Sequence, residues 1–258
     1  MERVLSLAAG VHPDLAPDDM VATAAAAGWS ACGVWFDPAT WSPRTTAAVR
    51  ERLDDTGLLA LDLEPIIPAE GHDDHGERII ETAAEIGARH VLFTSRLPEL
   101  AATIERFDTL CAVAQQYDVS LVCEFLPIFP LSTLATARDV VANTPAANAG
   151  ILVDNLHLSR SGGTVSDLHT IERARLPYIQ IADAPHQPPA DIAGLLEEAV
   201  NGRLLPGDGG LPIEELLRAV PDVPLSFEVR SQELRDGFSD PVERARHVLA
   251  AVRHLAEC

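Results

Sequence analysis

The chain has 258 residues, and its 19 positively charged side chains are all arginines because the sequence contains no lysine. This composition excludes Schiff-base aldolases, pyridoxal-phosphate enzymes and Walker-type nucleotide sites, each of which needs a lysine amine. The 39 Asp and Glu residues give a formal net charge of −20, which argues against nucleic acids and anionic membranes as partners, since both are bound through basic surface.

Short apolar runs rich in Val, Ile and Leu recur along the chain, with longer stretches of helical period between them. Runs of this kind are typical of strands in a parallel sheet that is buried on both faces. We therefore predict eight strands, which are, in chain order, Val4–Ala8, Ala31–Phe36, Leu58–Leu63, His90–Thr94, Ser120–Phe125, Gly150–Asp154, Tyr178–Ala182 and Leu225–Val229.

The stretches between these runs carry signals for the ends of helices. Asp240 followed by Pro241 is typical of a helix start, and Gly28, Gly57 and Gly87 stand where helices commonly end. We predict helices at Asp18–Ala27, Thr45–Asp55, Glu77–Ile86, Leu100–Tyr117, Ala135–Asn143, Pro212–Ala219 and Pro241–Leu255.

Eight strands that alternate with helices in about 250 residues predict an α/β fold of the (β/α)₈ barrel type, with residues 1–258 as one domain. An open doubly wound sheet is the alternative. No Gly-x-Gly-x-x-Gly follows the first strand, so the nucleotide-binding version of that sheet has no support. Residues Pro185–Gly202 form an extended loop after the seventh strand, and we expect this loop to hold a short helix and to act as a lid.

The cysteines and the apolar segments predict a protein of the cytoplasm. The four cysteines show no paired spacing, which argues against both disulfides and a zinc knuckle. No apolar stretch reaches about 18 residues, so we expect no transmembrane helix, and the N-terminus lacks a secretory apolar region. The cysteines are Cys32, Cys111, Cys123 and Cys258.

Polar side chains interrupt or end four consecutive predicted strands at their carboxyl ends, where a barrel of this type carries its active site. Glu124, Asp154 and Glu228 belong to strands five, six and eight, and Gln180 lies in strand seven. Buried carboxylates that lie close together repel one another, and a divalent cation between them removes this repulsion. Because all these ligands are oxygens, we predict one bound Mn²⁺ or Mg²⁺.

Taken alone, each of these residues also has a purely structural explanation. A salt bridge to an arginine would account for Glu124, and another, with Arg230 or Arg203 as the partner, would account for Glu228. Asp154 would cap the loop after strand six, and Gln180 would be a hydrogen-bonded core amide. The metal hypothesis is preferred because the residues stand at matching heights on consecutive strands.

At these residues the sequence resembles the sugar phosphate isomerase/epimerase superfamily, the xylose isomerase-like barrels that include inosose dehydratases, tagatose epimerases and hydroxypyruvate isomerases. The resemblance covers nearly the whole chain. It is carried by the segments CEFLP, VDNLH, QIADAP, GRLLPGDGGLP and FEVR, in that order.

The resemblance implies that Glu124, Asp154 and Glu228 are the carboxylate ligands of the metal. The fourth ligand of the family is usually a histidine, and Gln180 stands at its position. An amide oxygen leaves the charge of the site unchanged and makes the ligand set harder, which favours Mg²⁺ or Mn²⁺ over Zn²⁺. Glutamine at this position also resembles the 3-dehydroshikimate dehydratase branch.

The resemblance further implies that His157 contacts substrate or handles a proton, and that Arg203 binds substrate. Arg96 and Arg230 are further candidates for holding an anionic group of the substrate. Trp35 stands where many relatives place a glutamate, and this bulky wall favours a substrate less sugar-like than a free hexose. The remaining candidates for contact with substrate are Glu64 and Asp183.

These residues predict a metal-dependent isomerase or epimerase that acts on a small ketose-like or cyclic polyhydroxy keto substrate. Glu124 or Glu228 would remove a proton α to the carbonyl. A dehydratase with His157 as acid is one alternative, and a non-catalytic barrel that serves as a partner subunit is another. The DNA-repair endonuclease branch of the superfamily is disfavoured by Gln180 and by the acidic charge. The resemblance leaves a homo-oligomer open, since such barrels are often dimers or tetramers.

Overall fold

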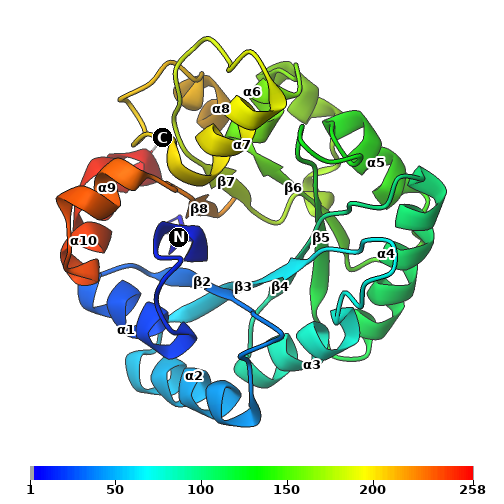
Figure 1. Cartoon of the computed structure of the whole chain (residues 1–258), viewed down its shortest axis with the longest axis horizontal. Coiled ribbons are helices and arrows are strands. Elements are labelled where there is room, and N and C mark those ends of the chain that lie inside the picture. The colour runs from blue at the N-terminus through cyan, green and yellow to red at the C-terminus, as the bar shows by residue number, and fades with distance from the viewer. Residues whose placement is uncertain (1–2, 258) are drawn as a thin grey trace.

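The computed structural model describes residues 3–257 and shows eight parallel strands closed into one barrel (Figure 1). Each strand pairs with its neighbours in chain order, and β8 closes onto β1. The predicted (β/α)₈ barrel is therefore confirmed. The strands are β1 Leu5–Leu7, β2 Ala31–Trp35, β3 Leu59–Ile66, β4 His90–Phe93, β5 Ser120–Glu124, β6 Ala149–Asp154, β7 Ile179–Ile181 and β8 Leu225–Phe227.

Helices surround the barrel, and all seven predicted ones are present with ends shifted by a few residues. Asp240 accepts hydrogen bonds from the backbone of Val242 and Glu243, as a helix cap does. The α-helices are α1 Pro17–Ala27, α2 Pro43–Thr56, α3 Gly76–Ile86, α4 Leu100–Gln115, α5 Leu134–Ala142, α6 Asn155–Arg160, α7 Ile192–Asn201, α8 Ile213–Ala219, α9 Gln232–Gly237 and α10 Pro241–Val252. Short 3₁₀ helices are η1 Ala9–Val11, η2 Val165–Thr170, η3 Arg173–Arg175 and η4 Arg253–Glu257.

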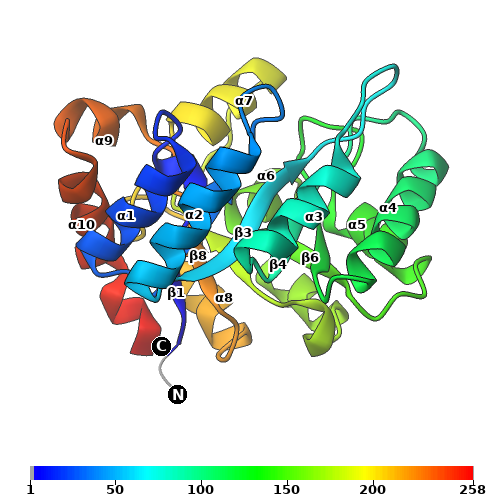
Figure 2. The same cartoon turned by 90° about the horizontal axis from the view of Figure 1, so that it is seen from below.

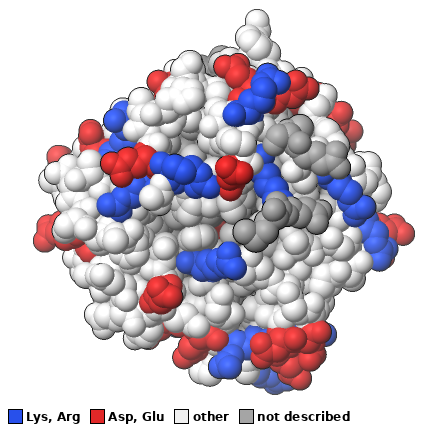
Figure 3. All heavy atoms as spheres, turned by 180° about the vertical axis from the view of Figure 1, so that it is seen from behind, with Lys and Arg blue, Asp and Glu red and all other residues white. Residues whose placement is uncertain are grey.

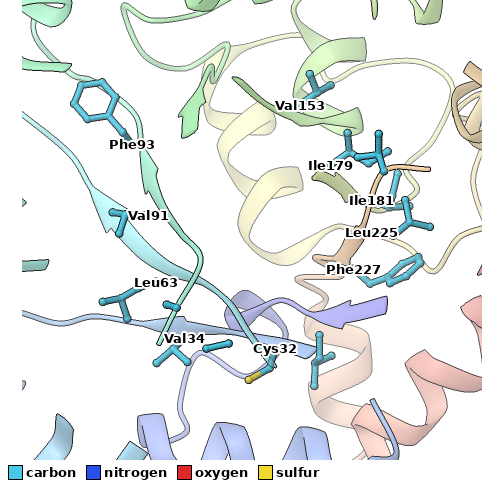
Figure 4. Packing of buried hydrophobic residues seen from close by; sticks show 14 of the residues in the cluster. Cys32, Val34, Leu63, Val91, Phe93, Val153, Ile179, Ile181, Leu225 and Phe227 are labelled. Carbon is cyan, nitrogen blue, oxygen red and sulfur yellow. The ribbon is translucent and has the colours of Figure 1, made fainter. Parts of the chain in front are cut away.

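Side chains alternate between the two faces of each strand, which separates the core into two layers. Outward-facing residues such as Val34, Phe93 and Phe227 pack beneath the helices (Figure 4). A second, smaller apolar cluster contains Leu92 and Val122, which lie inside the barrel on the alternate positions. Polar residues replace apolar ones at the inward positions nearer the carboxyl ends of the strands.

Strand β3 differs from the prediction because it continues through Glu64 and a cis Glu64–Pro65 bond to Ile66. Its pairing shifts register twice, once against β2 and once against β4. A Cβ at Gly33 would lie 2.5 Å from Asp62 Oδ1, so glycine on β2 makes room for the inward carboxylate of Asp62. The irregular strand thus adds two buried acidic residues to the interior.

The extended loop after β7 contains the expected short helix, α7. In Figure 2, α7 and α9 lie at one end of the barrel, and η4 lies at the other. On the face opposite the view of Figure 1, Arg side chains lie close to Asp and Glu side chains (Figure 3). Three of the cysteines are buried free thiols, and Cys258 lies outside the described residues. Within residues 3–257, none of the helices has the length and apolar character needed to cross a membrane.

Candidate metal centre at the barrel mouth

The four residues predicted as metal ligands all lie buried at the carboxyl ends of neighbouring strands. Glu124 ends β5 and Asp154 ends β6, while Glu228 directly follows β8. Gln180 pairs in register with Asp154 across β6 and β7. Their exposed fractions are between 0% and 6%, so none of them is a solvated surface group.

Arg203 lies among these carboxylates and forms the ion pairs of the site. Its Nη1 lies 2.5 Å from Asp154 Oδ2, and its Nη2 lies 3.0 Å from Glu228 Oε2. Its Nε donates to the carbonyl of Ala199 near the end of α7 at 2.9 Å. The structural explanation of Glu228 as an arginine partner therefore holds, and the arginine is fixed in place by α7.

Asp154 also caps α6, because its Oδ1 accepts hydrogen bonds from the backbone N–H groups of Leu156 and His157. This cap turns the His157 ring toward the carboxylates one turn along the helix. Side-chain atoms of Glu124, Asp154 and His157 lie within 4.8 Å of one another, close enough to share a metal ion. The sequence predicts His157 as a residue that contacts substrate or handles a proton, and the Asp-x-x-His spacing is the signal that could have placed it among the candidate ligands.

The proton of His157 can be placed from its neighbours. Arg203 Nη2 lies 3.5 Å from His157 Nε2, and a guanidinium can only donate. Nε2 therefore accepts, and Nδ1 carries the hydrogen. Burial lowers the pKa of His157 to about 4, so the ring is neutral at pH 7. A neutral imidazole with its lone pair on Nε2 is the form that binds metals, and a metal ion there would replace the hydrogen bond from Arg203.

Glu124 and Gln180 give the test of whether a cation fits these residues. Glu124 has no ion-pair partner among residues 3–257, and both side-chain polar atoms of Gln180 are buried without a hydrogen-bond partner. Buried polar groups are normally satisfied, and an unsatisfied one costs about 1–3 kcal/mol. A divalent cation would bind the Gln180 oxygen and balance the charge of Glu124, so the residues present fit a metal.

The charges of the site shift the pKa values of its acids in opposite directions. Burial and the neighbouring Glu228 and Asp154 raise the pKa of Glu124 well above its usual range. Burial also raises the pKa of Glu228 to about 7, although Arg203 opposes the shift. For Asp154, the charge and hydrogen bond of Arg203 outweigh burial and lower the pKa to about 2.

Glu64 lies in the same interior, and sequence reasoning missed the polar groups beneath it. Its Oε1 is buried without a partner, and the charges of Glu124 and Glu228 act on it. Below it, Asp62 lies near the Tyr178 hydroxyl, and burial raises the pKa of Asp62 to about 6. The irregular pairing of β3 hides these inward positions from a simple alternation of polar and apolar residues.

The sequence matches a known family and a curated protein. A family model described as "Xylose isomerase-like TIM barrel" matches residues 21–258. The chain belongs to this family. The inosose isomerase of Bacillus subtilis (strain 168) is 23% identical over 166 residues, and the match covers 60% of this chain and 57% of that protein.

Solved structures share the fold of this xylose isomerase-like barrel. The IOLI protein, whose crystal structure is described with a binding zinc atom, has a TM-score of 0.83 and 17% identity, with 99% of both chains covered. A xylose isomerase-like TIM barrel/4-hydroxyphenylpyruvate dioxygenase fusion protein also has a TM-score of 0.83, at 21% identity. This match covers 99% of our chain and 43% of the fusion protein. The chain thus spans less than two thirds of the inosose isomerase and of the fusion protein.

Three other predicted site residues of this xylose isomerase-like barrel lie around the mouth. Trp35 ends β2 with an exposed fraction of 43%, and the Arg230 guanidinium carbon lies 5.9 Å from its ring centroid. Arg96 is exposed and stacks over Phe129 at 4.7 Å. A cavity of about 660 Å³ opens beside Trp35, against η1 and the start of α2, rather than directly over the carboxylates.

Asp183 has a different position from the one expected of a substrate contact. Its two oxygens accept hydrogen bonds from the backbone N–H groups of Ala184, Gly207, Gly209 and Leu211, at 2.8 to 3.0 Å. Each oxygen of Asp183 thus accepts two backbone hydrogen bonds. The GDGG segment needs glycine here, because a Cβ at Gly209 would lie 2.4 Å from Asp183 Oδ1. Asp183 therefore holds the loop that follows Arg203.

Proposed function

We propose that this chain is a divalent-metal-dependent isomerase or epimerase that acts on a small ketose-like or cyclic polyhydroxy keto compound. The observation that carries the proposal is the buried group of Glu124, Asp154 and His157 at the barrel mouth, with Gln180 and Glu228 beside it. Most of these ligands are oxygens, which favours Mn²⁺ or Mg²⁺ as the bound ion. A bound ion would supply Lewis-acid polarisation of the substrate carbonyl.

The chain's own residues then handle the proton. Glu228, whose pKa burial raises to about 7, is matched to accept a proton from the carbon next to the carbonyl near neutral pH. Glu124 faces it across the site and is held as a carboxylic acid in the absence of a counter-charge. Return of the proton to the opposite face gives an epimer, and its return to the neighbouring carbon gives an isomer.

Arg203 has two tasks in this scheme. It forms ion pairs with both Asp154 and Glu228, and its guanidinium is placed to orient a substrate oxygen at the same point. Since its Nε is bound to the end of α7, a movement of the α7 loop would displace this arginine from the carboxylates. This link supports a role for the loop in closing the site over a small substrate.

A dehydratase is the second candidate, and Gln180 is the observation that favours it. An amide in place of the family's usual histidine is the departure that resembles the 3-dehydroshikimate dehydratase branch. In this reaction the same carboxylate removes the proton, and His157, once protonated, would give a proton to the leaving hydroxyl, which departs as water. The Nε2 of His157 lies 4.0 Å from Asp154 Oδ2, whose negative charge favours the protonated ring. We also propose that the partners are small molecules, with no nucleic acid or membrane among them.

Turnover measurements test these assignments. Purified protein would be freed of metal, reloaded with Mn²⁺, Mg²⁺ or Zn²⁺, and assayed on ketoses, inososes and 3-dehydroshikimate. We expect activity with Mn²⁺ or Mg²⁺ that is lost in Glu124→Gln and Glu228→Gln and kept in Glu214→Gln, whose side chain is 82% exposed. Metal binding and activity that survive in both site variants would contradict the proposal. Failure to bind any metal would favour the non-catalytic barrel.

A further inference from the structure

A second group of buried polar side chains lies inside the barrel, deeper than the candidate metal centre. Its four members have exposed fractions of 0% or 1%. They are Ser6 on β1, Asp62 on β3, Tyr178 directly before β7 and Ser226 on β8. On β3, β7 and β8 the next inward residue toward the mouth is Glu64, Gln180 or Glu228, so the four side chains form a layer beneath the mouth. We call them the inner oxygen group.

The strand pairing places the inner oxygen group around the barrel axis. Ser6 and Ser226 are direct partners across β1 and β8. Phe227, which follows Ser226, packs outward beneath the helices, so both serine side chains point inward. Tyr178 belongs to the apolar cluster inside the barrel, and its hydroxyl lies near Asp62. Because the interior of an eight-stranded barrel is only wide enough for side chains, these oxygens lie close together.

The oxygens of the inner group lack the partners that buried polar atoms normally have. Among residues 3–257, the Oγ atoms of Ser6 and Ser226, both carboxylate oxygens of Asp62 and the Tyr178 hydroxyl are buried without a well-formed hydrogen bond. In the same part of the chain, Asp62 forms no ion pair. Buried polar groups are normally hydrogen-bonded, and buried charges are paired or coordinate a metal. The inner oxygen group therefore has the character of a ligand set.

Packing holds the carboxylate of this group in its layer. A Cβ at Gly33 would lie 2.5 Å from Asp62 Oδ1, so glycine on β2 is what admits the carboxylate. The Tyr178 ring stacks on the ring of His90, with centroids 5.3 Å apart, and this contact keeps the hydroxyl beside Asp62. The carboxylate is thus enclosed by its neighbours and cannot turn toward solvent.

We propose that the inner oxygen group binds one alkali cation, Na⁺ or K⁺, between the carboxylate and the three hydroxyls. Four oxygen-bearing side chains form a hard ligand set, and a single carboxylate matches a single positive charge. A divalent ion such as Mg²⁺ fits less well, because it gives up its water shell reluctantly and this layer is enclosed. The site is separate from the candidate divalent centre at the mouth, and the inference does not rest on the proposed function.

Urea denaturation of protein freed of divalent ions tests this inference. The unfolding would be measured in NaCl, KCl or choline chloride at an equal ionic strength of about 0.2 M, so that surface charges are screened equally. A pH of about 8 keeps Asp62 ionised, since burial raises its pKa to about 6. We expect the folding equilibrium constant to be at least tenfold larger in NaCl or KCl than in choline chloride, as for a ligand at about ten times its Kd.

Variants assign the gain in stability to the inner oxygen group. Asp62→Asn should abolish the gain and Ser226→Ala should reduce it, and Ser226→Ala decides if Asp62→Asn does not fold. Ser95→Ala is the matched control, because Ser95 is equally buried but bonds to Thr103 outside this layer, and it should keep the gain. Glu124→Gln should also keep it, which separates this site from the mouth. Equal stability in all three salts, or a gain that survives unchanged in Asp62→Asn or Ser226→Ala, would overturn the proposal.

Discussion

Replacement of Arg203 by methionine tests how the arginine and the metal share the carboxylates. The side chain of Arg203 is 3% exposed, and its ion pairs to Asp154 and Glu228 measure 2.5 and 3.0 Å. Removal of one member of a buried ion pair typically costs about 3–5 kcal/mol, because the remaining charges are left uncompensated. We therefore expect the metal-free Arg203→Met protein to lose about that much free energy of unfolding.

Metal should restore a large part of this loss. A ligand at 100 times its Kd stabilises a folded protein by about 2.7 kcal/mol. Without Arg203, three carboxylates face the ion without a competing positive charge, so we expect Mn²⁺ to bind at least tenfold more tightly, which adds about 1.4 kcal/mol at the same concentration. The gain from Mn²⁺ should thus be larger in the variant than in the wild-type protein.

Urea denaturation with and without saturating Mn²⁺ measures both quantities. The matched control is Arg160→Met, because Arg160 Nε lies 2.7 Å from Glu198 Oε2 in an equally buried pair at the surface of contact between α6 and α7. Arg160→Met should lose a similar amount of unfolding free energy. Mn²⁺ should then stabilise this variant by no more than it stabilises the wild-type protein. An Mn²⁺ gain in Arg203→Met equal to or below the wild-type gain would refute the reasoning.

Three further predictions concern other parts of the molecule. Gln180→His should shift the metal preference toward Zn²⁺ by about tenfold, whereas Gln180→Leu should weaken the binding of every divalent ion. Competition titrations with Mn²⁺ and Zn²⁺ measure both effects, and unchanged affinities would remove Gln180 from the ligand set. Asp183→Ala should lower the free energy of unfolding by about 2–4 kcal/mol, because four backbone N–H groups lose their acceptor. It should also expose the 205–211 loop to protease, and resistance equal to that of the wild-type protein would contradict this. Burial lowers the pKa of His12 and of His90 from 6.5 to about 4, so the unfolded chain binds more protons between these values. The contribution of each histidine to stability should be full above pH 6.5 and be lost as the pH drops toward 4, by up to roughly 3 kcal/mol per histidine. Buried acids with raised pKa values, such as Glu228 and Asp62, change stability in the opposite sense as the pH drops. The part due to His12 is therefore the difference in unfolding free energy between the wild-type protein and His12→Gln, which should shrink as the pH drops below 6.5; a difference independent of pH would contradict this.

The barrel itself was predictable because its strands are continuous apolar runs separated by helices with ordinary caps. Ile179 and Ile181 on β7 show why, since their outward side chains are buried against helices as the sequence pattern requires. The helix ends followed from local chemistry, as the left-handed Gly28 at the end of α1 illustrates. Such signals depend on a few neighbouring residues and need no knowledge of the tertiary fold.

The candidate site was only partly predictable, since its details depend on contacts between distant segments. The sequence indicated Glu124, Asp154 and Glu228, and it offered Arg203 as a partner of Glu228, but not that Arg203 also pairs with Asp154. His12 reads as a loop residue, yet it is 2% exposed and its Nδ1 accepts a hydrogen bond from Arg244 at 3.1 Å. These arrangements arise from closure of the barrel, which brings residues separated by up to 232 positions into contact.

The binding of one divalent ion by the buried acids of the barrel mouth is the claim on which the rest depends. Isothermal titration of metal-free protein with Mn²⁺, compared with Glu124→Gln and Asp154→Asn, tests it most directly, with Glu214→Gln as the control. We predict one bound ion per chain in the wild-type protein and the control, and a loss of affinity of at least a hundredfold in each site variant. No binding to the wild-type protein, or equal binding to all four proteins, would contradict the account.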